Sequence, residues 1–277
     1  MKRFYFIVLK ICPLFAFIYS IISNFVTMYI DDGISFIYLF ICIQLQLNWY
    51  NAWKISKNVT TLKTENLNNH STIVNIDYQK ANSFISSERE RKFWYCEKCE
   101  NYTRRMAIHC SLCKKCYHFR DHHCFFMGTC VLRQNMGNFI LLCFYSSLSC
   151  LYSISVIGPY LYAHLNHFIR PESNIFNVLL SFCFPIALVR YLFSDEESCL
   201  LLVTLFDALV ATFFIGLCYG SWKFYACRTG KQIYSFNYKK EESFREIFGP
   251  NGLVNILFPF DSLVNFKYQN NCYLKEV

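Results

Sequence analysis

Charged residues are scarce in this sequence: only 17% of the 277 residues are Asp, Glu, Lys or Arg, whereas 54% are hydrophobic. A water-soluble protein carries charge on about 25% of its residues. Four long stretches hold almost no charge, namely residues 11–30, 33–53, 134–169 and 199–222, and only the last contains a charged residue, Asp207. Each stretch reaches the roughly 20 residues with which a helix crosses a bilayer. The composition therefore excludes a purely water-soluble protein and predicts a multi-pass membrane protein.

The sequence also lacks a cleavage site of small residues after its first apolar stretch, although Lys2, Arg3 and Lys10 precede that stretch as they would in a signal peptide. Instead, Asp31-Asp32-Gly33 follows and predicts a tight polar turn into the second apolar stretch. We therefore expect the first two stretches to form a helical hairpin and not a cleaved leader.

Basic residues are unevenly distributed along the chain. Of 27 Lys and Arg residues, 13 lie from Lys54 to Arg120 and eight from Lys223 to Lys275. The positive-inside rule then predicts four transmembrane helices, with both termini and the long loop after the second helix on the cytosolic side. This topology accounts for the net charge of +8, so the basic balance requires no nucleic-acid partner.

Residues 175–193 are a further apolar stretch, but they contain Pro185 and Arg190. A fifth span here would place the C-terminal cations outside, so we expect an interfacial or re-entrant helix, with a fifth span as the open alternative. Asp207 is a functional candidate because an acid inside a span is costly without a partner, which the sequence does not name.

The expected fold class is an all-α integral membrane protein, in which a cytosolic zinc-binding cysteine-rich domain separates transmembrane helices two and three. We expect the following division: 1–53, helices one and two; 54–93, a cytosolic connector; 94–136, the cysteine-rich domain; 137–222, helices three and four with a lumenal loop; and 223–277, a cytosolic tail.

Seven of the 16 cysteines fall between Cys96 and Cys130, and four histidines accompany them. The cluster comprises Cys96-x2-Cys99, His109-Cys110-x2-Cys113-x2-Cys116, His118, Asp121-His122-His123-Cys124 and Cys130. Cys-x2-Cys pairs bring two thiolates onto one tetrahedral ion, and zinc is the usual occupant. Disulfides are disfavoured because the segment is expected to face the reducing cytosol.

Counting ligands leaves one cysteine unused. Two structural zinc ions need eight ligands, which six cysteines and two histidines supply. A free thiol inside a zinc-stabilised loop suggests that the thiol itself reacts. Cys124 is the candidate, because a potential base and an acid that can orient that base precede it.

The whole pattern from Cys96 to Phe139 resembles the Asp-His-His-Cys protein S-acyltransferases, or palmitoyltransferases. The resemblance implies that Cys124 accepts the acyl group, that His122 is its general base and that Asp121 orients His122. It also implies two structural zinc sites: Cys96, Cys99, His109 and Cys116 in one, and Cys110, Cys113, His123 and Cys130 in the other. His118 is then an extra surface histidine.

On this resemblance, a long-chain acyl group moves from palmitoyl-CoA through Cys124 to cysteines of membrane-associated proteins, in the endoplasmic reticulum or Golgi membrane. Basic residues near the site are possible partners of the CoA phosphates, or simply a solvated cytosolic loop: Arg104, Arg105, Lys114, Lys115 and Arg120.

The sequence departs from the family at several positions. Phe125-Phe126 replaces the usual Pro-Trp, Thr129 replaces an Asn, and Val131-Leu132 replaces Val-Gly, although Asn135 and the tail segment Phe248-Gly249-Pro250 match. No Asp-Pro-Gly follows the second span, and Thr-Thr-x-Glu is reduced to Thr229-Gly230-Lys231-Gln232. The alternative function is therefore a catalytically silent, zinc-stabilised membrane scaffold of the same family.

Overall fold

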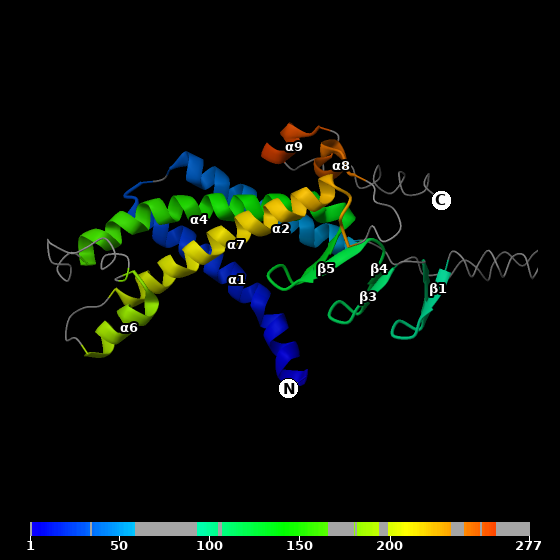
Figure 1. Cartoon of the computed structure of the whole chain (residues 1–277), viewed down its shortest axis with the longest axis horizontal. Coiled ribbons are helices and arrows are strands. Elements are labelled where there is room, and N and C mark those ends of the chain that lie inside the picture. The colour runs from blue at the N-terminus through cyan, green and yellow to red at the C-terminus, as the bar shows by residue number, and fades with distance from the viewer. Residues whose placement is uncertain are drawn as a thin grey trace, which may run out of the picture.

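The structure is a computed structural model that describes residues 2–33, 35–58, 93–104, 107–165, 180, 182–193, 199–233, 241–249 and 251–258. Most of the expected connector and the C-terminal residues 259–277 lie outside this set, as do parts of the expected lumenal loop. The described part is mostly helical, with three small β-hairpins beside one end of the helices (Figure 1).

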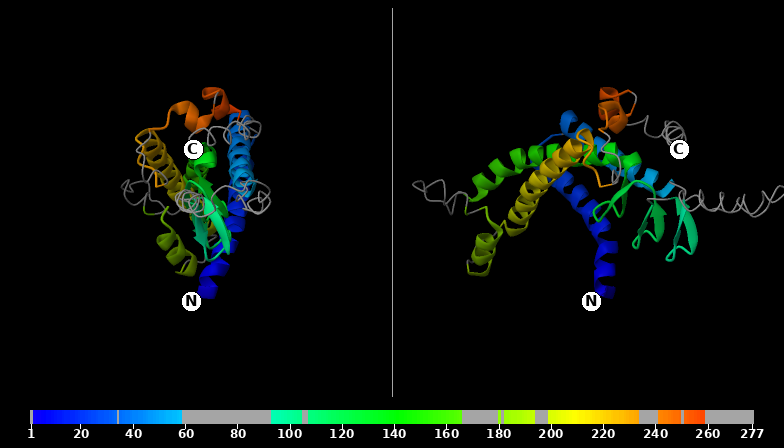
Figure 2. Two further views of the ribbon diagram at one scale, coloured as in Figure 1. Left: turned by 90° about the vertical axis from the view of Figure 1, so that its right-hand side faces the viewer. Right: turned by 45° about the vertical axis from the view of Figure 1, so that its right-hand side comes forward.

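Four long helices form the body of the molecule: α1 (Lys2–Ile30), α2 (Phe36–Asn58), α4 (Met136–Leu165) and α7 (Leu200–Arg228). The predicted hairpin turn is present between α1 and α2, where Asp32 adopts a left-handed φ of 49°. The central pair is α4 and α7, and α1 and α2 pack against α4 from other sides (Figures 1 and 2).

Three helical segments are long and apolar enough to cross a membrane: Ile11–Ile30, Arg133–His164 and Leu200–Arg228. The fourth expected span, α2, falls below this level because it contains Gln44, Asn48 and Asn51. All three of these side chains are buried, and Asn138 of α4 donates to Asn48 Oδ1 at 3.2 Å. These three polar side chains of α2 therefore face protein and not the outer surface.

Helices α4 and α7 approach each other closely. A Cβ added at Gly216 would lie 2.6 Å from Ser147 Oγ, and one added at Gly220 would lie 2.9 Å from Cys143 Cβ. The four-residue spacing puts both glycines on one face of α7, where their small size lets the helices approach closely.

The short helix α6 (Phe184–Phe193) has ten residues, hence a length of about 15 Å, half of what a bilayer core requires. Its first backbone N–H, that of Phe184, donates to Asp207 Oδ2 of α7 at 2.8 Å. Asp207 therefore has a structural partner: it satisfies one of the free N–H groups with which a helix begins.

Two further short helices, α8 (Phe244–Phe248) and α9 (Leu253–Leu257), bring the end of the described chain back onto α2 and α4. Gln44 of α2 donates to Leu257 O at 2.7 Å, and Tyr145 of α4 donates to Ile256 O at 2.8 Å. These two side chains satisfy carbonyl groups at the end of α9 that the helix itself leaves unpaired.

The cysteine-rich segment is not helical, so the expectation of an all-α protein needs correction here. It forms three two-stranded antiparallel hairpins: β1 (Phe93–Cys96) with β2 (Asn101–Arg104), β3 (Ile108–Cys110) with β4 (Lys115–Tyr117), and β5 (Arg120–Cys124) with β6 (Thr129–Leu132). In the first two hairpins the turn contains the second cysteine of a Cys-x2-Cys pair, and the residues on either side of each turn form the paired strands. Asn135 then joins β6 to α2 by donating to Cys130 O and Ala52 O.

Candidate acyl-transfer site and metal centres

The three hairpins repeat one plan at intervals of 14 residues. Cys96, Cys110 and Cys124 each end the first strand of a hairpin. The residue four positions later has a positive φ in every case: 51° at Glu100, 53° at Lys114 and 65° at Gly128. The sequence patterns considered above did not predict this repeat, although cysteine recurs at all three positions.

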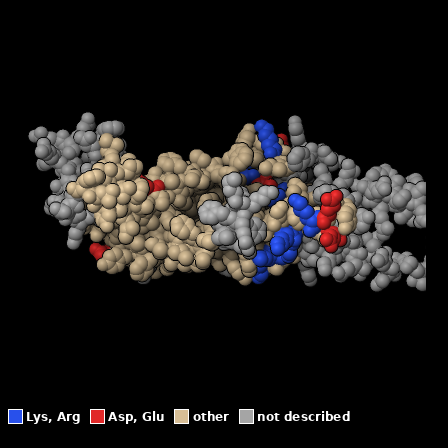
Figure 3. Space-filling view, turned by 90° about the horizontal axis from the view of Figure 1, so that it is seen from below, with Lys and Arg blue, Asp and Glu red and all other residues tan. Residues whose placement is uncertain are grey.

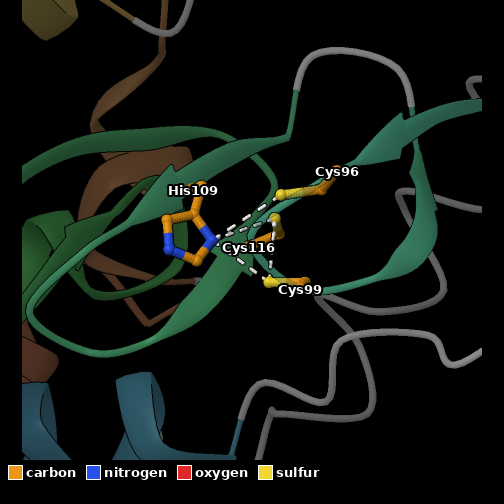
Figure 4. Close-up of side chains that lie close together, drawn as sticks. All are labelled: Cys96, Cys99, His109 and Cys116. Carbon is orange, nitrogen blue, oxygen red and sulfur yellow. Dashed lines mark hydrogen bonds between the residues drawn. The ribbon is translucent and has the colours of Figure 1, made fainter.

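The first candidate metal cluster lies between the β1–β2 and β3–β4 hairpins. Cys96 and Cys99 come from the first turn, and His109 and Cys116 come from the second hairpin. His109 Nδ1 points at all three sulfur atoms and lies 3.1 Å from Cys99 Sγ and 3.7 Å from each of the other two (Figure 4).

The second cluster repeats this arrangement one hairpin further along. It contains Cys110, Cys113, His123 and Cys130, and His123 Nδ1 lies 3.3 to 3.7 Å from their sulfur atoms. His109 and Cys110 are neighbours in the chain but belong to different clusters, so the two sites link three hairpins in series.

Both clusters have the dimensions of a tetrahedral zinc site. Zn–S bonds of about 2.3 Å and Zn–N bonds of about 2.0 Å place sulfur atoms about 3.8 Å apart and sulfur about 3.5 Å from nitrogen. The S···S distances here are 3.6 Å for Cys99–Cys116 and 3.7 Å for Cys113–Cys130. Three thiolates and one imidazole are also a usual donor set for structural zinc.

Arg120 contacts the second cluster, because its Nε donates to Cys130 Sγ at 3.3 Å. With a divalent ion bound in this cluster, a cation at this position would offset the surplus negative charge of the three thiolates. This contact gives Arg120 a role that differs from the CoA contact considered above. Of the other basic candidates, Arg105 and the side chain of Arg104 lie outside the described residues.

Cys124 belongs to neither cluster. It occupies the hairpin position at which Cys96 and Cys110 are placed, but Met127 stands where those hairpins have Cys99 and Cys113. The third turn therefore lacks a second thiol for a metal. The Cys124 side chain is 7% exposed within an apolar cluster that includes Met127, Phe139 and Ile140.

Burial raises the pKa of the Cys124 thiol, although the backbone N–H groups of Met127 and Phe126 act in the opposite direction. At neutral pH the sulfur is therefore protonated, and it needs a base before it can act as a nucleophile.

Asp121 and His122, the first two residues of the Asp121-His122-His123-Cys124 tetrad, form a hydrogen-bonded pair. His122 Nδ1 lies 2.7 Å from Asp121 Oδ2, and Asp121 is only 6% exposed. Burial raises the pKa of Asp121, but the hydrogen bonds from His122 and Lys223 outweigh this effect and hold the pKa below its usual value. An ionised Asp121 accepts the Nδ1–H of His122 and leaves Nε2 free to take a proton.

Aromatic rings enclose the His122 imidazole. Phe139 of α4 meets it edge to face at 5.3 Å between ring centroids, and Tyr219 of α7 does so at 6.0 Å. The ring orientation is therefore fixed by α4 and α7 as well as by Asp121.

Lys223 is a further residue at this site that was not predicted from the sequence. Its Nζ donates to Asp121 Oδ2 at 2.5 Å, and its side chain is only 5% exposed. In the sequence Lys223 is one of eight cations that follow the fourth apolar stretch, and it served there only as evidence for the membrane topology. Its position beside the site is visible only in the structure, where the end of α7 lies against the β5–β6 hairpin.

The part of the chain that carries this site is similar in sequence to a known protein family. Residues 89–239 match the model of a family described as DHHC palmitoyltransferase. The chain is 47% identical over 57 residues to palmitoyltransferase ZDHHC22 of Mus musculus, and this match covers 21% of the chain and 22% of that protein. It is 29% identical over 104 residues to probable protein S-acyltransferase 12 of Arabidopsis thaliana, covering 35% of this chain and 36% of the relative.

These matches span about a fifth to a third of the relatives' length. The family match, in contrast, runs from just before β1 to beyond the end of α7 and so includes both clusters, the tetrad and two long helices. It covers more than half of the sequence, and the chain therefore belongs to the DHHC palmitoyltransferase family.

Proposed function

We propose that this protein is a membrane-bound protein S-acyltransferase that moves a long-chain acyl group from acyl-CoA, with palmitoyl-CoA as the expected donor, to cysteines of protein substrates. The observation that carries the proposal is the environment of the Cys124 thiol. This thiol lies outside both metal clusters, follows a hydrogen-bonded Asp121–His122 pair and is buried at the level where the hairpins meet α4 and α7.

The chemistry proceeds in two steps. His122 Nε2 takes the Cys124 proton, and the thiolate attacks the thioester carbonyl; the bond to the CoA sulfur breaks, and the leaving thiolate regains the proton from His122. In the second step a cysteine thiol of the protein substrate gives its proton to His122, and the resulting thiolate attacks the thioester carbonyl on Cys124; the bond between the acyl group and Cys124 breaks, and the leaving Cys124 thiolate regains the proton from His122. Asp121 holds His122 in the required tautomer and stabilises the imidazolium.

The eight cluster residues would hold two zinc ions, whose filled coordination shells supply rigidity and no open position for a substrate. Because these ions link three hairpins of only three to five residues per strand, they would fix the β5–β6 hairpin on which Cys124 lies.

We also propose the four-span topology, with α2 as the second span and with the cysteine-rich domain and both termini in the cytosol. The burial of its Gln44, Asn48 and Asn51 supports α2 as a span, because its outer surface is then apolar. On the face seen in Figure 3, the Lys and Arg side chains of the described residues lie toward the end with the hairpins, where some acidic side chains accompany them, whereas the few charged side chains of described residues visible toward the other end are acidic, in keeping with the positive-inside rule.

The domain division stated above, at residues 53, 93, 136 and 222, belongs to this proposal. The endoplasmic reticulum or Golgi membrane is proposed on the resemblance alone.

The function is tested with purified protein and a clickable palmitoyl-CoA analogue. We expect a label that hydroxylamine removes, as it does from a thioester, and that moves to a cysteine-containing acceptor peptide added afterwards. Label that never appears on a correctly folded, zinc-loaded protein would contradict the proposal and favour the silent scaffold.

A further inference from the structure

A buried ion pair joins α7 to the active-site hairpin. Lys223 Nζ donates to Asp121 Oδ2, and the side chains are 5% and 1% exposed. Lys223 and Tyr219 lie four residues apart, on one face of α7, and Tyr219 contacts the His122 ring. One helical face therefore touches both members of the pair that precedes Cys124.

Stability alone does not account for such a pair. Removing two charges from water costs about as much as their attraction returns, and apolar residues of similar volume often do as well. Lys223 also lies over the rings of Trp222, at 4.7 Å, and Tyr219, at 5.6 Å, in surroundings that an apolar side chain would fill readily.

The carboxylate of Asp121 is held through one oxygen only. Oδ2 accepts hydrogen bonds from both His122 Nδ1 and Lys223 Nζ. Oδ1 is buried, and among the described residues it has no hydrogen-bond partner. Without Lys223, the carboxylate would rotate toward any donor for Oδ1, and the bond that orients His122 would be weakened.

We propose that Lys223 is a positioning residue for acyl transfer: by fixing Asp121 Oδ2, it holds the His122 imidazole where Nε2 accepts the Cys124 proton. This inference rests on the proposed function of Cys124 and His122. It assigns to α7, a helix distant in sequence from the tetrad, a part in the reaction.

The test is a double-mutant cycle on the full-length protein, with zinc content checked for each variant. The variants are Lys223→Met, Lys223→Arg, Asp121→Asn and the double variant, with exposed Lys231→Met as the matched control. Two rates are measured: acylation from palmitoyl-CoA, and alkylation of Cys124 by iodoacetamide, located by peptide mass spectrometry. The second rate does not depend on acyl transfer.

Lys223→Met should lower both rates by about 10- to 100-fold, the size of effect that a misplaced catalytic group produces. Lys223→Arg should restore most of the loss, and Lys231→Met should match the wild type. The double variant should be no slower than Asp121→Asn, within about twofold, because Lys223 acts through Asp121.

A wild-type rate in Lys223→Met would overturn the inference, as would a double variant in which the two losses multiply. If Lys223→Met does not fold, the double variant remains available, because it leaves no unpaired buried charge. Its rates are then compared with those of Asp121→Asn, and a double variant slower by more than about twofold would overturn the inference. A wild-type protein whose Cys124 is alkylated but never acylated would contradict the proposed function, while the alkylation rates would still decide the role of Lys223.

Discussion

At the scale of single residues, two adjacent histidines are given different tasks by the alternation of a β-strand. Successive side chains on a strand point to opposite faces. His123 therefore contacts the sulfur atoms of the second cluster, while His122 bonds to Asp121 and packs against Phe139. Although both are histidines, one would be a metal ligand and the other a base.

This division predicts opposite outcomes for the two alanine variants. His122→Ala should slow acylation of Cys124 by about 10²–10⁴-fold, because general-base assistance is lost, while two zinc ions remain. His123→Ala should lose metal and thermal stability together. Acylation rate and zinc content should be measured on the same samples. Zinc loss in His122→Ala but not in His123→Ala would mean that the roles are reversed.

The potential metal ligands could be predicted because they lie close together in the sequence, whereas contacts between residues far apart in the sequence could not. The two sets of four potential ligands followed from Cys-x2-Cys spacing and the family resemblance, and each set lies within 4.8 Å in the structure. Lys223 was not predictable, because 102 residues separate it from Asp121. The partner of Asp207 was equally hidden, since it is a backbone N–H of α6.

At the scale of elements, the hairpins are too short to be stable without a crosslink. Strands of three to five residues in two-stranded pairs bury little apolar surface, so zinc ions held at the two clusters would supply much of their folding free energy.

Cys96→Ala should therefore release the first zinc ion and lower the thermal stability of the cysteine-rich domain. Elemental analysis should find two zinc ions in the wild type and fewer in this variant. Cys183→Ala is a suitable control, because Cys183 is exposed and lies outside both clusters. Fewer than two zinc ions in folded wild-type protein would refute the eight-ligand assignment.

The turn after Cys124 depends on a close approach to α1. Gly128 has a φ of 65°, but the same turn position is occupied by Glu100 and Lys114 in the other hairpins, so backbone conformation alone does not require glycine. A Cβ at Gly128 would lie 2.8 Å from Pro13 Cγ. Pro13 therefore limits this position to glycine.

Gly128→Ala should push the β5–β6 turn away from α1 and slow acylation of Cys124 by about tenfold or more, since small displacements of a reacting group are costly. Gly33→Ala is the control, because a Cβ there meets nothing closer than 3.9 Å. Equal rates for the two variants, measured by thioester labelling, would show that the contact with Pro13 does not position Cys124.

The long apolar helices could be predicted from the sequence, but the reasons for the polar residues within α2 and for the way α7 ends could not. The turn between α1 and α2 follows from Asp31-Asp32-Gly33, but hydropathy alone does not reveal that α2 turns its amides toward α4 and α9. The departure from the family at Gly230 also has a local reason. Gly230 has a φ of 65°, and Lys231 N donates back to Ala226 O, which ends α7 in a Schellman turn.

At the scale of the whole molecule, the proposed topology places the hairpins, the tail helices α8 and α9 and the chain ends on one side of the membrane. Tags inserted near Asn69 and after Val277 should then show equal protease access in sealed microsomes, because 22 Lys and Arg residues lie between residues 54 and 133 and between 223 and 277. Opposite access would mean that residues 175–193 span the membrane.

The central claim is that Cys124 carries the acyl group. Met127 replaces the second cysteine that a metal site would need, and the Asp121–His122 pair would accept the Cys124 proton. The most direct test of this claim is peptide mass spectrometry of the protein after incubation with palmitoyl-CoA, for the wild type and Cys124→Ser, with zinc content determined on both. The account predicts a hydroxylamine-sensitive palmitoyl group on the peptide containing Cys124, none in Cys124→Ser, and two zinc ions in each. A thioester formed at the wild-type level in Cys124→Ser would place the nucleophile elsewhere and contradict the mechanism.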